Sequence, residues 1–498
     1  MILNLSPFKL TLLIIVLISY LIFFLASLSS YPGSGIIYSL FSLIYAILIF
    51  GAILKFRSYS YLFLSVFLWL GLWFKMSVHL ILDYPYGEAT GNFYIINGNM
   101  DDVAIVASVG ALALITVYLF FLRLNIKSPV EISTKSKKYP VHYKFYLNNK
   151  NKIFFIFWSM VLVTAASNIF FNIQISGLVP STILVYPLNA LVYWALSIGF
   201  ILTFTFMIGW RCRLEGVPPS MLQLLSIGLL ASVTSIAILS RGQYVFIVSA
   251  VFVYTLFNYK FIFHSSKKSA HSKFSLLLLI LSYLVFFYIV IVSVDFLRGY
   301  YFDMSLDAGN IVASLSLDKF STSLTDYSGF SRMFLQLAVD RWIGVEGIMA
   351  VTSYPDKGAA LILEALTRTH NIGEIDIYQK ISNSHYKGMD NFRVSFATIP
   401  GIFAFLYYSG SLLVVFFGSF VMGTLMLFFE YFVKRMLKCS LTSVIISISL
   451  SNIVSQFGLF PVNIFKSLFI LLIFLIFARI IISSEAIIFY LRSKTSLL

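Results

Sequence analysis

Long apolar runs and short polar stretches alternate along almost the whole chain. A helix needs about 20 mostly apolar residues to cross the hydrocarbon core of a bilayer. Runs of that length predict an all-α, polytopic membrane protein with about twelve transmembrane helices. The predicted spans are 9–28, 35–55, 61–82, 103–122, 153–173, 190–210, 220–239, 243–260, 274–295, 411–433, 440–459 and 463–482. Ser240, Arg241 and Gly242 alone separate the seventh span from the eighth, so these two spans are expected to form a tight hairpin.

The connection between the ninth and tenth spans, residues 295–410, is far longer than the others. A loop of this length in a compact protein is usually functional. Apolar residues recur at helical spacing in 333–352 and again in 357–369, which predicts a small helical cap on one face of the membrane. Segment 396–408 is apolar but broken by a Pro-Gly pair, which makes it a candidate re-entrant or interfacial segment.

The basic residues predict the orientation of these helices. Cytoplasmic loops carry an excess of Lys and Arg, and most of the 35 basic residues fall in alternate connections, with 123–152 the richest. This pattern puts both termini in the cytoplasm and 295–410 on the opposite face. The connections predicted on that face without any Lys or Arg are 29–34, 83–102, 174–189 and 460–462. Arg241 is the exception among the short connections.

The composition supports a membrane protein and excludes several other classes. Charged residues make up 11% of the chain and hydrophobic residues 59%, whereas soluble domains carry about 25% charged residues. The net charge of +15 is explained by topology, so nucleic acid is not an expected partner. The two cysteines, Cys212 and Cys439, fall beside basic segments, and no zinc-ligand spacing occurs. Walker, Rossmann, GxSxG and HExxH motifs are also missing from the sequence, so no metal or cofactor is expected.

Two arginines are candidates for binding an anion at the non-cytoplasmic face. Arg241 lies at the hairpin tip, and Arg298 follows the ninth span at a similar predicted depth. A guanidinium can hold a phosphate through two hydrogen bonds. The alternatives are that Arg241 extends to the membrane surface without a further role, and that Arg298 pairs with Asp295.

Other ionisable residues are weaker candidates. Lys75 and His79 lie on one face of the third span, where a cavity-lining or hydrogen-bonded pair without a catalytic role is the simpler interpretation. Arginines and histidines in the long loop could hold a diphosphate or deprotonate a sugar hydroxyl. These loop residues are Arg341, Arg368, His370, His385 and Arg393, with Asp340, Glu346 and Asp390 as alternative bases. An ordinary surface charge is the simpler interpretation of each one taken singly.

The layout and several short motifs resemble the O-antigen polymerase family. The shared layout comprises about twelve helices, cytoplasmic termini, a Ser-Arg-Gly hairpin and one large late loop. The loop stretches 340–350 and 396–401, and the exit at 407–410, also look like that family. The related O-antigen ligases share the same layout.

This resemblance implies a function at the periplasmic face of a bacterial inner membrane. The substrates would be oligosaccharide repeat units carried on undecaprenyl diphosphate, and the growing glycan would be transferred to a new unit, releasing undecaprenyl diphosphate. Neither metal nor nucleotide is implied. Membrane lipids and a chain-length regulator protein are the other partners expected.

The predicted spans also divide the chain, and the chemistry of the charged residues suggests which of them would act in such a reaction. Residues 1–294 would hold the first nine transmembrane helices, 295–410 the periplasmic loop, and 411–498 the last three helices and a short tail. The expected catalytic residues are His370, His385 and Arg341. The residues expected to bind the diphosphate are Arg241, Arg298, Arg368 and Arg393.

Three other functions remain open on the sequence. An O-antigen ligase uses the same chemistry with a different acceptor. A lipid-linked oligosaccharide flippase or other transporter often shows two related halves, which this sequence lacks. The third alternative is a membrane protein with a structural or interaction role.

Overall fold

The computed structural model describes most of the chain. The described residues are 7–83, 85–94, 99–124, 141–185, 187–259, 262, 269–306, 336–368, 374–384, 399–437, 439–458 and 461–495. Within these ranges the regular structure is helical and contains no strand. The all-α prediction is therefore confirmed for the described part of the chain.

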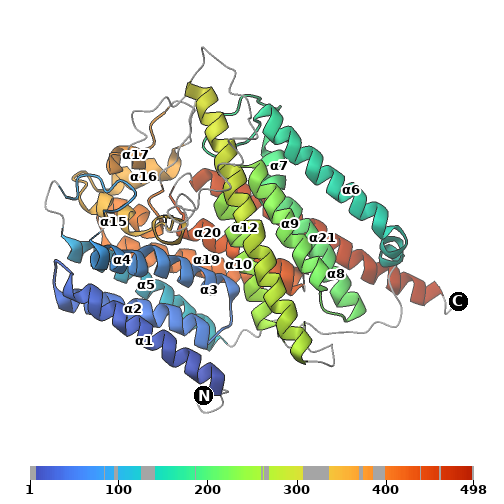
Figure 1. Ribbon diagram of the computed structural model, residues 1–498, viewed down its shortest axis with the longest axis horizontal. Coiled ribbons are helices and arrows are strands. Elements are labelled where there is room, and N and C mark those ends of the chain that lie inside the picture. The colour runs from blue at the N-terminus through green and yellow to red at the C-terminus, as the bar shows by residue number, and fades with distance from the viewer. Residues whose placement is uncertain are drawn as a thin grey trace.

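Long helices lie side by side and form the body of the molecule (Figure 1). They are α1 (Pro7–Ser29), α2 (Gly35–Leu54), α3 (Tyr59–Leu68), η2 (Trp69–Phe74), α4 (Lys75–Leu82), α5 (Met100–Arg123), α6 (Val141–Phe171), α7 (Leu188–Trp194), η3 (Ala195–Gly199), α8 (Phe200–Glu215), α9 (Met221–Ala237), α10 (Arg241–Phe257), α12 (Ser269–Leu306), α19 (Leu412–Leu437), α20 (Ser440–Ser455) and α21 (Pro461–Thr495). The elements η2 and η3 are π-helical turns, and each joins the helices on either side of it into one continuous rod.

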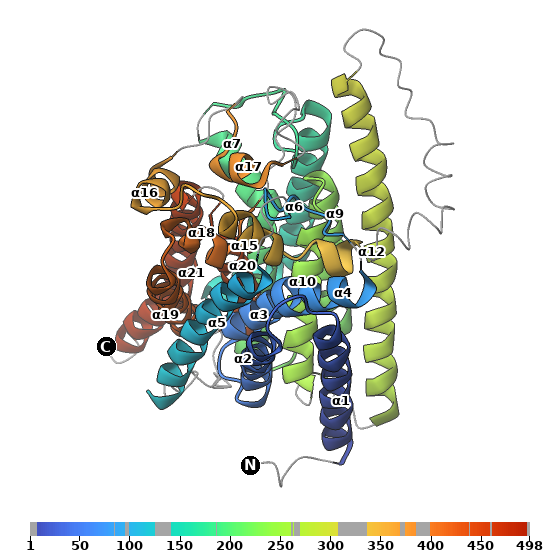
Figure 2. The ribbon, with the colours of Figure 1, turned by 90° about the vertical axis from the view of Figure 1, so that its left-hand side faces the viewer.

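A set of short helices gathers at one end of this body (Figure 2). They are η4 (Gln336–Asp340), α15 (Val345–Thr352), α16 (Ala359–Thr367), α17 (Ile377–Ser382), α18 (Ile402–Leu406) and η6 (Tyr407–Ser409). We call the described residues 336–368, 374–384 and 399–409 the cap segment, and the end of the body that carries them the cap end. The small helical cap predicted from the sequence is thus present, although the side of the membrane on which it lies stays a prediction.

A helix occupies each of the twelve predicted spans. Within the described residues, seven helices are long and apolar enough to cross a membrane: Gly35–Leu54, Tyr59–Leu82, Met100–Arg123, Lys144–Phe171, Leu188–Cys212, Phe274–Tyr301 and Leu412–Leu437. Five more are apolar but shorter: Val16–Ser29, Met221–Ala237, Arg241–Phe257, Ser440–Ser455 and Ser467–Ile481. This is the architecture of a helical membrane protein. The exact number of crossings and the orientation of the termini stay predictions.

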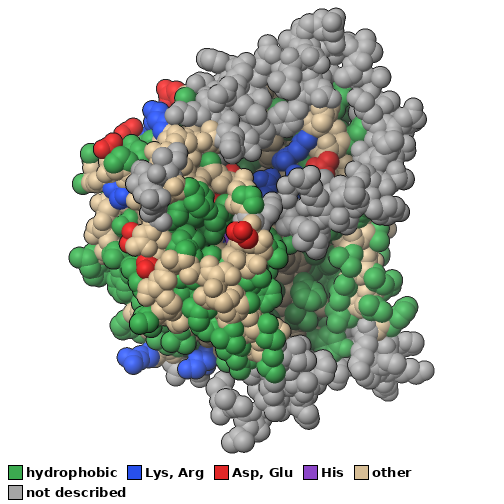
Figure 3. Space-filling model, turned by 60° about the vertical axis from the view of Figure 1, so that its left-hand side comes forward, with side chains coloured by type: hydrophobic (Ala, Val, Ile, Leu, Met, Phe, Trp, Pro, Cys, Tyr) green, Lys and Arg blue, Asp and Glu red, His purple; other side chains and the backbone are tan. Residues whose placement is uncertain are grey.

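The outer surface of the helical body is apolar. Large hydrophobic side chains such as Phe170, Leu413 and Phe428 are between 68% and 84% exposed. Figure 3 shows hydrophobic side chains over much of this face, with basic side chains at its lower margin. A soluble protein rarely exposes such large apolar patches, so this surface suits contact with lipid.

The predicted helix over 333–352 is wrong in its middle. The π-helical turn η4 ends at Asp340, and α15 begins only at Val345. The backbone carbonyls of Asp340 and Trp342 accept hydrogen bonds from a lysine of another helix. Since those carbonyls serve a tertiary contact, the helical spacing of the apolar residues does not carry one helix through this stretch.

Of the other two predictions for the loop, the helix expected in 357–369 is confirmed as α16. The re-entrant or interfacial character of 396–408 stays a prediction. In this stretch Ile402–Leu406 form the short helix α18, which follows Gly401 with its φ of 81°. Side chains of α18 are buried within the protein, so this helix packs against other helices.

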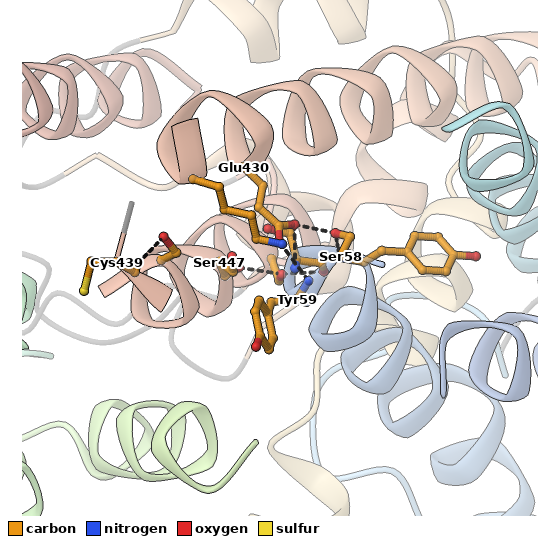
Figure 4. Close-up of polar contacts among 10 residues, drawn as sticks. Ser58, Tyr59, Glu430, Cys439 and Ser447 are labelled. Carbon is orange, nitrogen blue, oxygen red and sulfur yellow. Dashed lines mark hydrogen bonds and ion pairs between the residues drawn. The ribbon is translucent and has the colours of Figure 1, made fainter. Parts of the chain in front are cut away.

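A buried glutamate joins two helices at the end of the body opposite the cap. Glu430 of α19 is 2% exposed. Its carboxylate accepts hydrogen bonds from the hydroxyl of Ser58 and from the backbone N–H groups of Tyr59 (2.9 Å) and Ser60 (3.0 Å) at the start of α3 (Figure 4). The ammonium of Lys434 lies 2.7 Å from the same carboxylate. Glu430 thereby satisfies backbone groups that a helix leaves without partners in its first turn.

We expect Glu430→Ala to destabilise the protein by about 3–5 kcal/mol, because it leaves Lys434 and two buried N–H groups without their partner. Thermal unfolding in detergent should show a melting temperature several degrees below wild type. Glu430→Gln keeps the shape of the side chain and one hydrogen-bond acceptor, so its melting temperature should fall between those of wild type and Glu430→Ala. The control is Glu215→Gln, at a partly exposed ion pair with Arg211. Equal melting temperatures for Glu430→Ala and the control would contradict this role.

Candidate functional site

The third predicted span is a single rod whose middle is a π-helical turn. This turn, η2, lies between α3 and α4, and such turns are frequent at functional sites. Gly71 lies within it, and a Cβ at this position would be 2.1 Å from the carbonyl oxygen of Ile343. At Gly344 a Cβ would lie 2.6 Å from the carbonyl oxygen of Gly71. Two glycines facing each other therefore allow the cap segment to touch the helix backbone directly.

Lys75, one turn after Gly71, holds the cap segment through its ammonium group. Its side chain is 1% exposed, and its Nζ lies 2.5 Å from Oε1 of Glu346. The same nitrogen donates hydrogen bonds to the carbonyl oxygens of Asp340 (2.7 Å) and Trp342 (3.0 Å). An ammonium has three protons, and here each has an acceptor from the cap segment. The buried charge of Lys75 is thus neutralised by Glu346 on α15.

His79 lies one further turn along α4 and faces the same segment. Its Nε2 is 3.2 Å from Oδ1 of Asp340, and the two side chains are 2% and 15% exposed. The ring of Tyr86 stacks on the imidazole at 4.1 Å between centroids. Burial, with a smaller effect from the charge of Glu346, raises the pKa of the Tyr86 phenol well above its usual value. The Tyr86 phenol is therefore neutral at neutral pH.

A second group of charges lies where α9 meets α10. Leu239 has a φ of 52° in the hairpin, which turns the chain before α10 begins at Arg241. Nη1 of Arg241 is 2.8 Å from Oδ1 of Asp295 on α12. The guanidinium of Arg298, also on α12, donates a hydrogen bond of 2.8 Å to the carbonyl oxygen of Leu239. The arginine at the hairpin and the arginine after the ninth span therefore meet, as their similar predicted depth suggested.

The two groups of charges are connected through consecutive residues of the cap segment. Asp340 faces His79, and the next residue, Arg341, lies within electrostatic reach of Arg241. Trp342 then stacks against Phe67 of α3 at 5.8 Å between ring centroids. Three neighbouring side chains thus contribute a carboxylate, a guanidinium and an aromatic contact to one place.

Among the predicted site residues, the structure brings three together. Arg241 and Arg298 converge around Asp295 at the cap end, and Arg341 lies within electrostatic reach of Arg241. Arg368 has different partners, because its guanidinium lies 3.5 Å from Glu364 and 3.6 Å from Glu374 and lines a separate small cavity beside Tyr408. The predictions for His370, His385, Asp390 and Arg393 lie outside the described residues.

The contacts bear on two of the alternatives raised by the sequence. Asp295 is the ion-pair partner of Arg241, so Arg241 does not simply extend to the membrane surface. Lys75 and His79 each bond to the cap segment instead of only lining a cavity. No sequence signal pointed to the partners Glu346 and Asp340, since pairing between distant segments leaves no periodic pattern.

This arrangement can bind an anion and accept a proton. Two guanidinium groups near one carboxylate, with Arg341 within electrostatic reach of Arg241, leave positive charge in excess, which suits a phosphate or diphosphate. Asp340 carries a carboxylate that is partly exposed and held by an imidazole, which suits a general base. Among the described residues no group of three or more His, Cys, Asp or Glu side chains could hold a metal ion.

We expect Lys75→Met to destabilise the protein by about 3–5 kcal/mol, because Glu346 would stay buried without a counter-charge. Glu346→Met should have a similar effect. The double variant should recover much of the loss, since replacing both members of a buried pair with apolar residues removes the unpaired charge. Thermal unfolding in detergent measures all three, with Lys380→Met, at an exposed lysine of the cap segment, as control. Additive losses in the double variant would contradict the pairing.

Known proteins do not add to this picture. No protein-family model matches the chain. No curated protein and no solved structure match it either. The roles assigned to residues therefore rest on the geometry and chemistry of this chain alone.

Proposed function

We propose that the chain is a membrane glycosyltransferase that polymerises oligosaccharide repeat units carried on undecaprenyl diphosphate, in the manner of O-antigen polymerases. The observation that carries this proposal is the meeting of Arg241 and Arg298 around Asp295 at the cap end of a helical membrane protein, with Arg341 within electrostatic reach of Arg241. Three elements supply these arginines, and the diphosphate would bind among them. The product would be O-antigen or a related surface polysaccharide.

The surroundings of the arginines suit a lipid-linked anion. Below Arg241, α10 carries the exposed side chains of Phe252 and Leu256, and the partly buried Phe246 packs against Phe67 of α3. Figure 3 shows a recess that holds basic and acidic side chains, with a hollow of hydrophobic side chains beneath it. A polyprenyl diphosphate has the same division, because its charged group adjoins a long apolar tail.

The proposed reaction is a displacement at the anomeric carbon of the growing glycan. The bond between this carbon and the diphosphate oxygen breaks, and undecaprenyl diphosphate leaves with the bonding electrons. A hydroxyl oxygen of the incoming unit forms the new glycosidic bond and gives its proton to a base. Charge grows on the leaving diphosphate, where fixed guanidinium groups stabilise it best.

Asp340 is the described group best suited to accept the proton. It precedes Arg341 in the chain, so a base and an anion-binding group are held on the same short stretch. Its carboxylate is 15% exposed and is oriented by His79 at 3.2 Å. A positioned base of this kind contributes about 10²- to 10⁴-fold to rate.

The proposal includes a location in the cell. The protein would lie in a bacterial inner membrane with its termini in the cytoplasm and the cap segment in the periplasm. The basic side chains of Arg211 and Lys434 lie near the end opposite the cap, which suits a cytoplasmic assignment under the positive-inside rule.

An O-antigen ligase would use the same geometry. The number of repeat units on lipid A in a deletion strain distinguishes a polymerase from a ligase. Without a polymerase, lipid A carries one repeat unit, whereas without a ligase it carries none.

We expect Arg341→Ala to lower the rate of transfer by about 10²- to 10³-fold, because one donor to the developing charge is lost. Its side chain is exposed, so the fold should remain intact. The measurement is a glycan ladder gel from a deletion strain that carries the variant, with protein level checked in the same cells. Arg211→Ala, at the opposite end, is the matched control and should restore the full ladder. A full ladder from Arg341→Ala, Arg241→Ala and Arg298→Ala alike would end the proposal.

We expect Asp340→Asn to reduce transfer by about 10²- to 10⁴-fold, since the amide retains the size of the side chain but accepts a proton poorly. Undecaprenyl-linked single units should accumulate, measured by extraction and chromatography. Asp356→Asn changes an exposed carboxylate of the cap segment and should behave as wild type. Normal chain lengths with Asp340→Asn would exclude this residue as the base without excluding the role of the arginines.

A further inference from the structure

Helix α16 of the cap segment has three different faces. At about 100° per residue, Ala365 lies on the face that is buried against the protein. Leu363 and Leu366 lie on a second face and are 63% and 41% exposed. Glu364 and Thr367 lie on a third face and are exposed. An apolar exposed face next to a polar exposed face is typical of a helix at a membrane surface.

The position of α16 agrees with this pattern. Just before the helix, the backbone N–H of Gly358 donates a hydrogen bond of 2.8 Å to the carbonyl oxygen of Tyr408, a few residues before α19 begins. Helix α16 also contacts η6 and α21. Figure 2 shows it beside the cap end of the helical body, seen along its axis. It therefore crosses the ends of two long apolar helices instead of extending them.

The exposed leucines continue the apolar surface of those two helices. Leu412 and Leu413 in the first turn of α19 are 38% and 69% exposed. Phe465, in the first turns of α21, is 68% exposed. Lipid covers such side chains in a membrane protein, so the bilayer would reach the level of α16.

We propose that α16 lies within the boundary between lipid headgroups and acyl chains at the cap end, with Leu363 and Leu366 inserted into lipid. A protein partner would fit this face less well. A stable protein interface buries about 800 Å² on each side, and two leucine side chains on a nine-residue helix offer far less. The ends of α16 are polar, with Lys357 bonded to backbone carbonyls and Arg368 paired with Glu364.

This inference has a structural consequence for the cap segment. Helix α16 follows α15, which carries the Glu346 that neutralises Lys75. The cap segment would then be held at two places, by an ion pair inside the protein and by lipid at its edge. The inference does not depend on the proposed transferase activity, nor on which side of the membrane the cap lies.

Nitroxide labelling tests this inference in liposomes. Leu363→Cys and Leu366→Cys are labelled separately in a Cys212→Ser background, and the buried Cys439 is retained. Collisions with oxygen, which partitions into lipid, are compared with collisions with a water-soluble nickel chelate. Leu413→Cys on α19 is the lipid-facing control, and Lys380→Cys on α17 is the exposed polar control.

We expect oxygen-to-nickel collision ratios at both leucines several-fold above the ratio at Lys380→Cys and close to that at Leu413→Cys. A ratio like that at Lys380→Cys would overturn the inference, because the helix would lie in water. Low collision rates with both reagents would also overturn it, since a second copy or another protein would then cover the face. Glycan ladders from the unlabelled Leu363→Cys and Leu366→Cys variants report separately on the proposed transferase activity, so the failure of one proposal can be told from the failure of the other.

Discussion

The burial of one ammonium group is the constraint on which the rest of this architecture depends. Lys75 lies within an otherwise apolar helix, where a charge is costly unless it is paired. The chain meets this cost with the Glu346 carboxylate and two backbone carbonyls, all from the cap segment. Neutralising the charge therefore also decides where the cap segment lies. The contact between Gly71 and Gly344 makes this possible, because larger side chains would keep the two backbones apart.

The same constraint organises the candidate site. Lys75 binds the carbonyls on either side of Arg341, so the backbone that carries this guanidinium is fixed at two points. Asp340 is fixed further by His79. Catalytic groups must be held to within about 0.5 Å of their working geometry, and a stretch anchored by a buried ammonium suits that need. Arg241 and Arg298 are anchored separately, through Asp295 and the backbone of the hairpin.

Much of the helical layout could be predicted from sequence, because each crossing must be about as long as the bilayer is thick. The hairpin at Arg241 followed in the same way, since few residues separate two apolar runs. The junction of Lys75 with Glu346 could not be predicted, because hydrophobic periodicity is a local property and these residues are far apart in the chain. The prediction of one continuous helix over 333–352 failed for the same reason, because tertiary hydrogen bonds between η4 and α15 outweighed the helical pattern. The ion pair between Glu430 and Lys434 is weakly indicated by the sequence, because the acid lies four residues before the lysine in an apolar run.

The distance along the chain between Lys75 and Glu346 also bears on how the protein is made. Synthesis proceeds from the N-terminus, and domains form as their residues emerge. The helix with Lys75 is translated before Glu346, so under the predicted twelve-span layout six further spans are translated before the ammonium can meet this carboxylate. Until then a chaperone, an anionic headgroup or retained water would have to shield it. The contact between Lys75 and the cap segment can thus form only after Glu346 has been translated, whatever the order in which the earlier helices associate.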